Sequence, residues 1–231
     1  MVKHSKRYQQ AAAKVDRNKI YGPSEGLALI KSLPAAKFDE SVEIAVNLSI
    51  DPKKTDQLVR GAVSLPKGLG KKIKIIVFAE GEKAAAAKEA GADEVGSGEL
   101  AEKIQGGWTD FDIVITSPDM MKHVGKLGKV LGPQGKMPSP KSGTVTPDVA
   151  SAVREFKAGK VEFRTDAGGN VHALLGKRSF PVEDLMLNLQ AFLDHVSSLR
   201  PPAARGAFFR KISISTSMGP GVLIAWEVVH A

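Results

Sequence analysis

The sequence predicts a mixed fold in which a parallel α/β domain is inserted into an α+β domain built from both ends of the chain. Two observations on pattern and one on charge predict it. Strands alternate with helices between residues 69 and 159, whereas short paired strands and a long helix follow residue 159. The net charge of +8 divides into +5 over residues 1–68, +1 over 69–159 and +2 over 160–231. The basic ends, 1–68 and 160–231, are therefore one predicted domain, and 69–159 are the inserted one.

The composition limits the class of protein. The apolar fraction of 42% and the charged fraction of 25% are ordinary for a globular domain, and no apolar run exceeds five residues. A membrane-spanning helix needs about 20 apolar residues, and the basic N-terminus lacks the apolar core of a secretory signal. The absence of cysteine excludes disulfides and thiolate zinc sites. We expect a soluble, cytoplasmic protein that binds no membrane. A pI near 9.6 favours an anionic partner, the alternative being a solvated surface with a basic tail.

The N-terminal part predicts helices followed by strands. Residues 5–33 are predicted to be helical in two pieces, broken at residues 21–23, with Ser24 as the N-cap of the second piece. Residues 41–50 alternate strictly between apolar and polar side chains, which is typical of a half-buried strand. A further short strand is predicted over 59–65.

The middle segment predicts a parallel sheet covered on both faces. Strands are predicted over 72–79, 93–95 and 112–116, and helices over 82–90 and 99–105. A third helix begins at residues 146–148, where Thr146 supplies the capping hydroxyl, and ends at Gly159.

After Gly159 the pattern changes. Strands over 160–165 and 170–175 are predicted to form a hairpin around residues 166–169, followed by a helix over 181–199. Two more strands, over 211–215 and 222–229, flank the turn at 218–221. Because glycine permits unusual backbone angles, Gly68 and Gly159 at the two crossings are predicted to act as hinge residues.

The search for catalytic chemistry argues against an enzyme. The five histidines are scattered, and we expect no catalytic residue, no metal and no cofactor. Residues 132–136 resemble a phosphate-binding loop but have the wrong glycine spacing. Residues 96–101 fit a loose dinucleotide fingerprint, but Glu99 would repel a pyrophosphate there. The acidic pair Asp39 and Glu40 is expected at the solvated surface.

Two segments instead favour recognition of folded RNA. Residues 37–43 combine a cation, an exposed aromatic side chain and oxygen acceptors at the start of a strand, and residues 215–221 combine three hydroxyls, a methionine and two glycines. Small hydroxyls and accessible backbone suit the shallow, 2′-hydroxyl-bearing surface of RNA. Either segment could also be an ordinary turn.

Six strings of the sequence carry a specific resemblance. They are residues 37–43 (KFDESVE), 63–70 (VSLPKGLG), 91–93 (GAD), 131–144 (LGPQGKMPSPKSGT), 161–164 (VEFR) and 217–220 (SMGP). Over essentially its full length the chain resembles the bacterial ribosomal protein L-one (uL-one) family of the large subunit. The proline- and glycine-rich run over 131–144 is the most specific string.

The resemblance implies both a fold and a function. It implies a split α+β domain with an inserted, doubly wound (Rossmann-like) α/β domain joined by a hinge. It implies a structural protein that binds large-subunit ribosomal RNA, forms the mobile stalk at the tRNA exit site and assists release of deacylated tRNA. It also implies a translational repressor that binds its own operon's messenger RNA, and a monomer when free of the ribosome. Two rival classes are an enzyme that uses a nucleotide and a protein–protein adaptor.

The resemblance also implies which residues contact RNA. They are Lys37, Phe38, Ser41, Glu43, Asp166, His172, Thr216, Ser217, Met218 and Gly219. Three positions depart from the family pattern, because Ser217 replaces a threonine, Ala167 a common lysine and Lys211 a small hydroxyl residue.

Structural alternatives stand beside these assignments. Phe38 could join the strand to a helix, Met218 could belong to the core, and His172 could be a structural histidine. The run over 132–144 is read as a structural loop, with an RNA or tRNA contact as the alternative.

Overall fold

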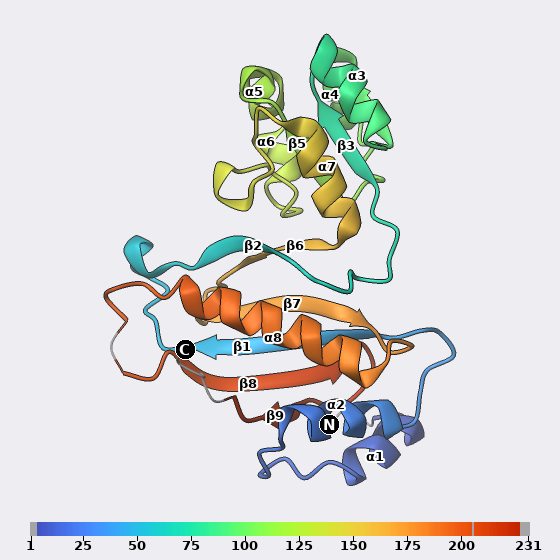
Figure 1. Ribbon diagram of the computed structural model, residues 1–231, viewed down its shortest axis with the longest axis vertical. Helices are drawn as coiled ribbons and strands as arrows, with labels where there is room; N and C mark the ends of the chain where they lie inside the picture. Colours follow the sequence, from blue (N-terminus) through green and yellow to red (C-terminus); the bar gives the residue numbers. More distant parts are fainter. Residues whose placement is uncertain (1–3, 205, 227–231) are drawn as a thin grey trace. The chain divides into compact units, whose positions relative to one another are not determined.

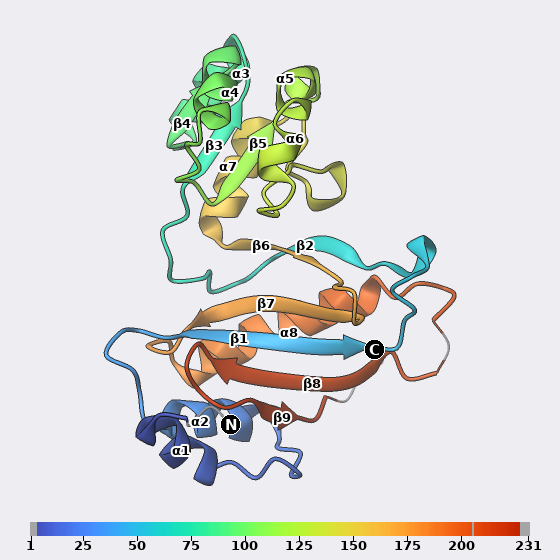
Figure 2. The same ribbon diagram turned by 180° about the vertical axis from the view of Figure 1, so that it is seen from behind.

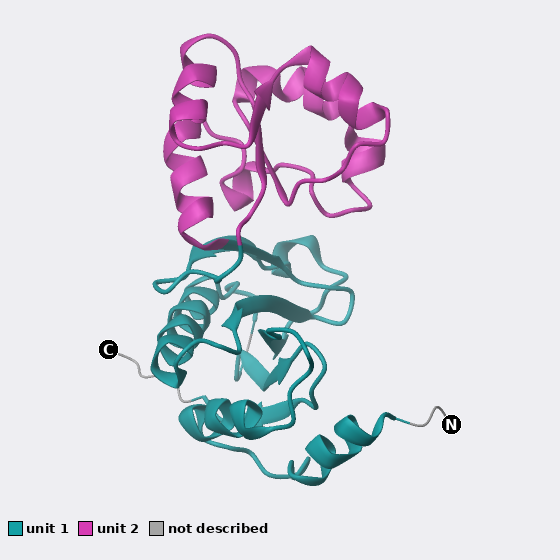
Figure 3. Cartoon of the chain, turned by 90° about the vertical axis from the view of Figure 1, so that its right-hand side faces the viewer, with its two compact units in different colours: residues 1–71, 161–231 teal, residues 72–160 magenta. Residues whose placement is uncertain are grey.

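The computed structural model describes residues 4–204 and 206–226, so the last part of the strand predicted over 222–229 lies outside the described residues. The chain forms two compact units (Figure 3). Unit 1 comprises Met1–Lys71 and Val161–Ala231, and unit 2 comprises Lys72–Lys160. Among the described residues, no helix has the length and apolarity that a membrane crossing requires.

Unit 1 is organised around a four-stranded sheet with the order β7-β1-β8-β9. Its strands are β1 (Ser41–Leu48), β7 (Asn170–Lys177), β8 (Phe209–Thr216) and β9 (Val222–Ile224). The central strand β1 pairs antiparallel with both β7 and β8. Its alternate apolar residues are buried, as the strict alternation in sequence predicts. Alternation therefore gives β1 one apolar face and one open face.

The helices that the structure describes cover one face of this sheet. Helix α8 (Val182–Ser198) lies across it (Figure 1), and its apolar stripe of Leu185, Leu189, Phe192 and Val196 is fully buried. Helix α2 (Pro23–Ser32) packs beside it, and α1 (Lys6–Ala13) precedes α2. The prediction of Ser24 as the N-cap of α2 was wrong. Gly22 occupies that position, because Pro23 has the fixed φ and the missing N–H that suit the first helical residue.

The predicted hairpin around 166–169 was also wrong. β6 (Lys160–Arg164) pairs with β2 (Arg60–Ser64) in a separate two-stranded sheet, whereas β7 joins β1. Only an isolated bridge between Thr165 and Val171 remains of the hairpin. Phe163 of β6 is buried against α8, with its ring centroid 5.4 Å from that of Phe192. Burial of this ring favours pairing of β6 with β2, which also contacts α8. Residues between β1 and β2 form a 3-10 turn, η1 (Thr55–Gln57).

Unit 2 contains a parallel sheet with the order β4-β3-β5. Its strands are β3 (Ile75–Phe78), β4 (Glu94–Gly96) and β5 (Ile113–Thr116). Successive residues of β3 enter two different cores, which confirms a sheet covered on both faces. One face carries α3 (Glu82–Glu89) and α7 (Val149–Ala158), and the other carries α4 (Gly98–Gln105), α5 (Met121–Gly125) and α6 (Gly128–Leu131).

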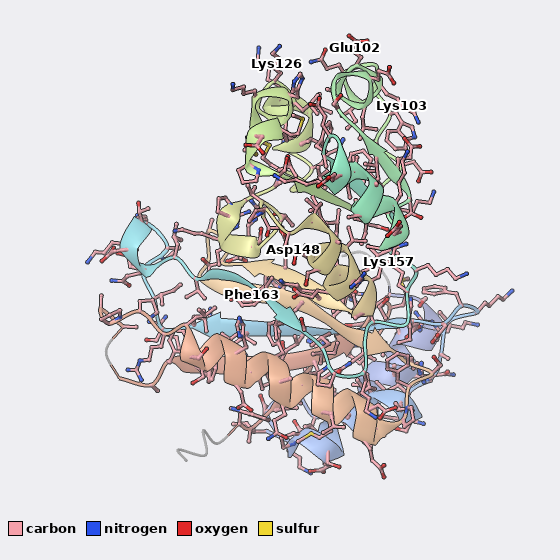
Figure 4. The ribbon with its side chains drawn as sticks, turned by 45° about the horizontal axis from the view of Figure 1, so that its top comes forward. Glu102, Lys103, Lys126, Asp148, Lys157 and Phe163 are labelled. Atoms are coloured by element: carbon pink, nitrogen blue, oxygen red, sulfur yellow. The ribbon has the colours of Figure 1, made fainter. Side chains whose placement is uncertain are left out.

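The ends of α7 correct one prediction and confirm another. Asp148, labelled in Figure 4, is the N-cap, because its carboxylate accepts a hydrogen bond from the amide of Ser151 at 3.1 Å. Thr146 therefore does not cap the helix; its hydroxyl accepts from the amide of Asp148 instead. Gly159 ends α7 with a φ of 118°, as predicted for a glycine stop. Two 3-10 turns, η2 (Pro118–Met120) and η3 (Pro140–Ser142), complete the unit.

Candidate nucleic-acid interface

The face of the unit 1 sheet opposite α8 is open (Figure 2), since none of the described helices crosses it. Three rows of paired residues run across β7, β1 and β8 on this face. They are Leu174–Glu43–Ser215, His172–Ala45–Ser213 and Asn170–Asn47–Lys211. Most of these side chains are small or polar, and those of Glu43, His172 and Lys211 are exposed. The face thus offers hydroxyls, amides and charges to a partner.

The loop before β1 presents Phe38 to solvent. Its side chain is 57% exposed, which rules out the reading that it joins the strand to a helix. Lys37 is also exposed. Asp39, which follows Phe38, accepts hydrogen bonds from the amide and the hydroxyl of Ser179, at 3.1 and 2.8 Å. The exposed aromatic ring is therefore carried by a fastened loop.

The turn after β8 presents Met218. This side chain is 51% exposed, so it does not belong to the core. Two hydrogen bonds, one donated by each residue, join the neighbouring Ser217 to Ser41. The Ser217 amide donates to the Ser41 carbonyl at 3.0 Å, and the Ser41 amide donates to the Ser217 hydroxyl oxygen at 3.0 Å. These bonds set the Phe38 loop and the Met218 turn side by side.

A buried carboxylate that sequence reasoning missed organises both segments. Glu40 is fully buried, contrary to its expected place at the solvated surface. Its oxygens lie 3.3 Å from the guanidinium of Arg7 and 3.4 Å from that of Arg178. Glu40 also accepts from the amide of Ala36 at 2.9 Å. A buried charge is tolerated because it is paired and hydrogen-bonded in this way.

Arg7 extends this network to the Met218 turn. Its Nη1 atom donates to the Pro34 carbonyl at 3.3 Å, and its Nη2 atom donates to the Met218 carbonyl at 3.0 Å. The fork of the guanidinium suits such multiple acceptors. Helix α1 therefore fixes the turn directly. No local pattern in the sequence signals this contact, because residues 7 and 218 lie at opposite ends of the chain.

Thr216 and Gly219 have roles inside the turn. The Thr216 side chain is buried, so it offers no side-chain contact to RNA. A Cβ atom placed on Gly219 would lie 2.4 Å from the Thr216 hydroxyl oxygen. The turn therefore needs glycine at 219 for internal packing, in addition to any approach of a partner.

Asp166 and His172 lie together beside the open face. The Asp166 carboxylate accepts from the amides of Asn170 and Gly168, both at 2.8 Å, and lies 3.4 Å from the His172 imidazole. These bonds, led by the Asn170 amide, lower the pKa of Asp166 to about 2. Asp166 thus orders the turn. His172 leaves most of its side chain exposed, as a binding role requires.

The predicted hinge glycines both have left-handed backbones. Gly68 has a φ of 65°, and its carbonyl accepts from the buried Asn188 amide of α8 at 3.0 Å. Gly159 is the C-cap of α7. Their role in a hinge stays a prediction.

The two glycine-rich segments of unit 2 do not form phosphate sites. The Lys136 ammonium donates to the carbonyls of Thr109 and Phe111, at 3.1 and 2.7 Å, and is not aimed at a ligand. Glu99 lies in the first turn of α4, where it disfavours an anion. Buried Ser142 and Thr144 tie the run over 132–144 together by hydrogen bonds, which supports its reading as a structural loop. Within the described residues, no acidic or histidine cluster could hold a metal.

Comparison with known proteins gives one consistent result. A family model described as "Ribosomal protein L1p/L10e family" matches residues 29–220. The chain is 56% identical to "Large ribosomal subunit protein uL1" of Cutibacterium acnes, over 96% of both chains. It is 53% identical to the protein of that name from Kosmotoga olearia over 99% of both chains, and 54% identical to that from an Azoarcus species over 97% of both.

These matches identify the class of the protein. Such relatives are structural proteins of the ribosome and not enzymes, and bacterial large subunits are cytoplasmic particles. The match of the family model covers most of the chain, and the relatives are aligned over nearly their full length. The chain therefore belongs to the ribosomal protein L1p/L10e family and is a protein of the large ribosomal subunit.

Proposed function

We propose that unit 1 binds large-subunit ribosomal RNA through one continuous surface, here called the Phe38–Met218 surface. It consists of Lys37, Phe38, Ser41, Glu43, Ser217, Met218 and Gly219. The observation that carries the proposal is the exposure of two apolar side chains, Phe38 and Met218, on two segments that hydrogen bonds between Ser41 and Ser217 join and a buried charge network holds in place. Exposed apolar groups on a fixed framework are typical of a binding site.

The chemistry of this surface suits RNA better than it suits a generic polyanion. The Phe38 ring and the Met218 thioether can pack on bases or sugars, because both present flat or flexible apolar area. Ser41 and Ser217, whose hydrogen bonds join the two segments, carry short hydroxyls that can meet a 2′-hydroxyl. Glu43 cannot contact a phosphate favourably, but its carboxylate can accept from 2′-hydroxyls or base amino groups. Asp166, through the turn that it orders, and exposed His172 extend the same face.

The direct test is binding of the full protein to fragments of large-subunit ribosomal RNA over a range of salt concentrations. The logarithm of the affinity should fall with the logarithm of salt, with a slope that reflects a few phosphates. Weakening of this binding by Met218→Ala would support the surface. A flat salt response would exclude phosphate contact and favour the adaptor class.

We further propose that the protein forms the mobile stalk at the tRNA exit site and assists release of deacylated tRNA. The resemblance supports this role, since the family is associated with that stalk. The hinge predicted at Gly68 and Gly159 would serve the same motion. The test compares release of deacylated tRNA from ribosomes with and without this protein. Equal release rates would contradict the proposal.

We also propose that the protein represses translation of its own operon by binding the messenger RNA with the Phe38–Met218 surface. One surface cannot hold two RNAs, so the ribosomal RNA fragment should displace the messenger in competition. Met218→Ala should weaken binding of both RNAs in parallel. Simultaneous binding would contradict the shared surface. The free protein should be a monomer, which light scattering can test.

A further inference from the structure

One long segment of unit 2 contains basic side chains but no acidic ones. Unit 2 has 13 basic and 12 acidic residues and is nearly neutral as a whole. Residues 120–147 nevertheless contain five lysines and no acidic residue, so this segment is +5 and the rest of the unit is −4. The segment comprises α5, α6 and the loop that leads to α7. A neutral unit therefore carries a strongly basic region.

The lysines of this segment differ from other lysines of the unit in their partners. Outside the segment, five of the seven lysines form ion pairs with acidic side chains, as in Lys74–Asp110, Lys83–Asp119 and Lys103–Glu94. Within the segment, none of the five lysines has an ion pair in the part of the chain that the structure describes. Lys136 is occupied by main-chain carbonyls. Lys122, Lys126, Lys129 and Lys141 are exposed and have no ion-pair partner among residues 4–204 and 206–226.

Three of these lysines lie close together in sequence on two short consecutive helices. Lys122 belongs to α5, Lys126 is its C-cap, and Lys129 belongs to α6. Figure 4 shows the Lys126 side chain extending away from the ribbon of α5 into open space. Val124, Leu127 and Leu131, which alternate with the lysines, are fully buried. The apolar residues therefore anchor the helices and leave the lysines facing outward.

We propose that Lys122, Lys126 and Lys129 form a second RNA-binding surface, on unit 2, that takes the phosphates of an RNA backbone. Ammonium groups without an ion-pair partner leave their positive charge uncompensated, and RNA phosphates compensate that charge while releasing counterions. Ammonium groups on flexible stems suit phosphates as point charges and need no specific sequence. This proposal rests on the proposed function only for the class of partner, RNA. No residue of the Phe38–Met218 surface takes part in it.

The test uses the full-length protein and a labelled 24-nucleotide single-stranded RNA. The RNA has a mixed sequence so that sequence-specific binding by unit 1 contributes little to the measured affinity. The variant Lys122→Gln/Lys126→Gln/Lys129→Gln should bind this RNA at least fivefold more weakly at low salt. The slope of log affinity against log salt should become shallower by about 2, since each single-strand phosphate contact contributes about 0.7.

A matched control separates local contact from overall charge. The variant Lys74→Gln/Lys83→Gln/Lys103→Gln removes the same charge from the same unit, but at lysines that already have acidic partners. It should leave the salt slope unchanged. Equal weakening by both triple variants would show that only long-range charge matters and would overturn the proposal. Unchanged RNA binding by the first variant would overturn it as well, and would leave an acidic protein as the partner to seek.

The Met218→Ala variant keeps the two proposals apart. It should weaken binding of the ribosomal RNA fragment while leaving the salt slope for the 24-nucleotide RNA intact. If Met218→Ala has no effect on the ribosomal fragment, the proposed function of unit 1 fails and the lysine surface stands on its own result. Thermal melting of each variant confirms that the fold is kept.

Discussion

The Nη2 atom of Arg7 donates a hydrogen bond to the main-chain carbonyl of Met218 at 3.0 Å, while Nη1 of the same guanidinium lies 3.3 Å from fully buried Glu40. Helix α1 thereby holds the Met218 turn, which lies more than 200 residues later in the sequence. This bond uses the main-chain carbonyl of Met218, so the largely exposed side chain can contact a partner. Arg7 thus links the buried carboxylate of Glu40 to the turn that carries Met218.

Replacement of Met218 by alanine should weaken binding to the ribosomal RNA fragment by about 1–3 kcal/mol, as for loss of a contact that stacks on a base. The free energy of unfolding should change by no more than about 0.5 kcal/mol, since the side chain is largely exposed. Filter binding and thermal melting measure the two quantities. Leu187→Ala is the control, because Leu187 is 46% exposed but lies on α8. Early melting with normal binding would place Met218 in the core.

Replacement of Arg7 by methionine should affect both stability and binding. Buried Glu40 loses one of its two cationic partners, which should cost about 1–3 kcal/mol of folding free energy. The Met218 turn loses its anchor, so RNA affinity should fall under conditions where the variant is fully folded.

Lys6→Met provides the matched control for Arg7. It removes the same charge from the same helix at an exposed residue. It should leave the melting temperature unchanged and alter RNA binding only slightly. Equal effects of the two variants on binding would mean that Arg7 acts through its charge and not through the turn.

Gly219→Ala should disturb the turn even without RNA, because its Cβ would lie 2.4 Å from the Thr216 hydroxyl oxygen. The added Thr216→Ala change removes that oxygen, so the double variant should recover much of the binding lost by Gly219→Ala. Thr216→Val should give no such recovery, since a methyl group replaces the oxygen. Identical binding by Gly219→Ala and the unmodified protein would show that the turn relaxes at no cost.

Asp166 should make the stability of unit 1 depend on acid pH. Its pKa in the folded protein, about 2, lies below the ordinary value of 3.8. Stability from this carboxylate is therefore fully present above about pH 4 and is lost as the pH falls toward 2. Asp166→Asn should flatten that part of the profile. NMR titration checks the pKa directly, and a value near 3.8 would contradict the hydrogen-bonded turn.

The sequence predicts elements with strong local signals. The alternation of β1, the apolar stripe of α8 and the glycine stop of α7 all appear as expected. The helices α5 and α6 were not predicted, because glycines at 125, 128 and 132 interrupt them and each is only one turn or so long. The hairpin failed because burial of Phe163 against α8 favours another strand partner for β6.

The candidate site shows the same division. The exposed Phe38 and Met218 were found through the resemblance and a hydroxyl- and glycine-rich turn, whereas Arg7 was not found at all. Asp39 and Glu40 are adjacent acids, yet one faces solvent and the other is buried between two arginines. The difference in burial between these two neighbours comes from tertiary packing alone. Glu40 pairs with arginines more than 30 positions away in the sequence, and such distant pairs produce no periodic sequence pattern that could predict them.

The strand order of unit 1 determines when the interface can exist during synthesis of the chain. β1 ends at Leu48, but its neighbours β7 and β8 begin only at Asn170 and Phe209. All strands of unit 2 lie within Lys72–Lys160. That unit can therefore fold before strands β7 and β8, which pair with β1 in unit 1, have been synthesised. The hydrogen bonds between Ser41 and Ser217 can form only after residue 217 has been synthesised. A nascent chain therefore lacks the Phe38–Met218 surface until β8 has been synthesised and has paired with β1.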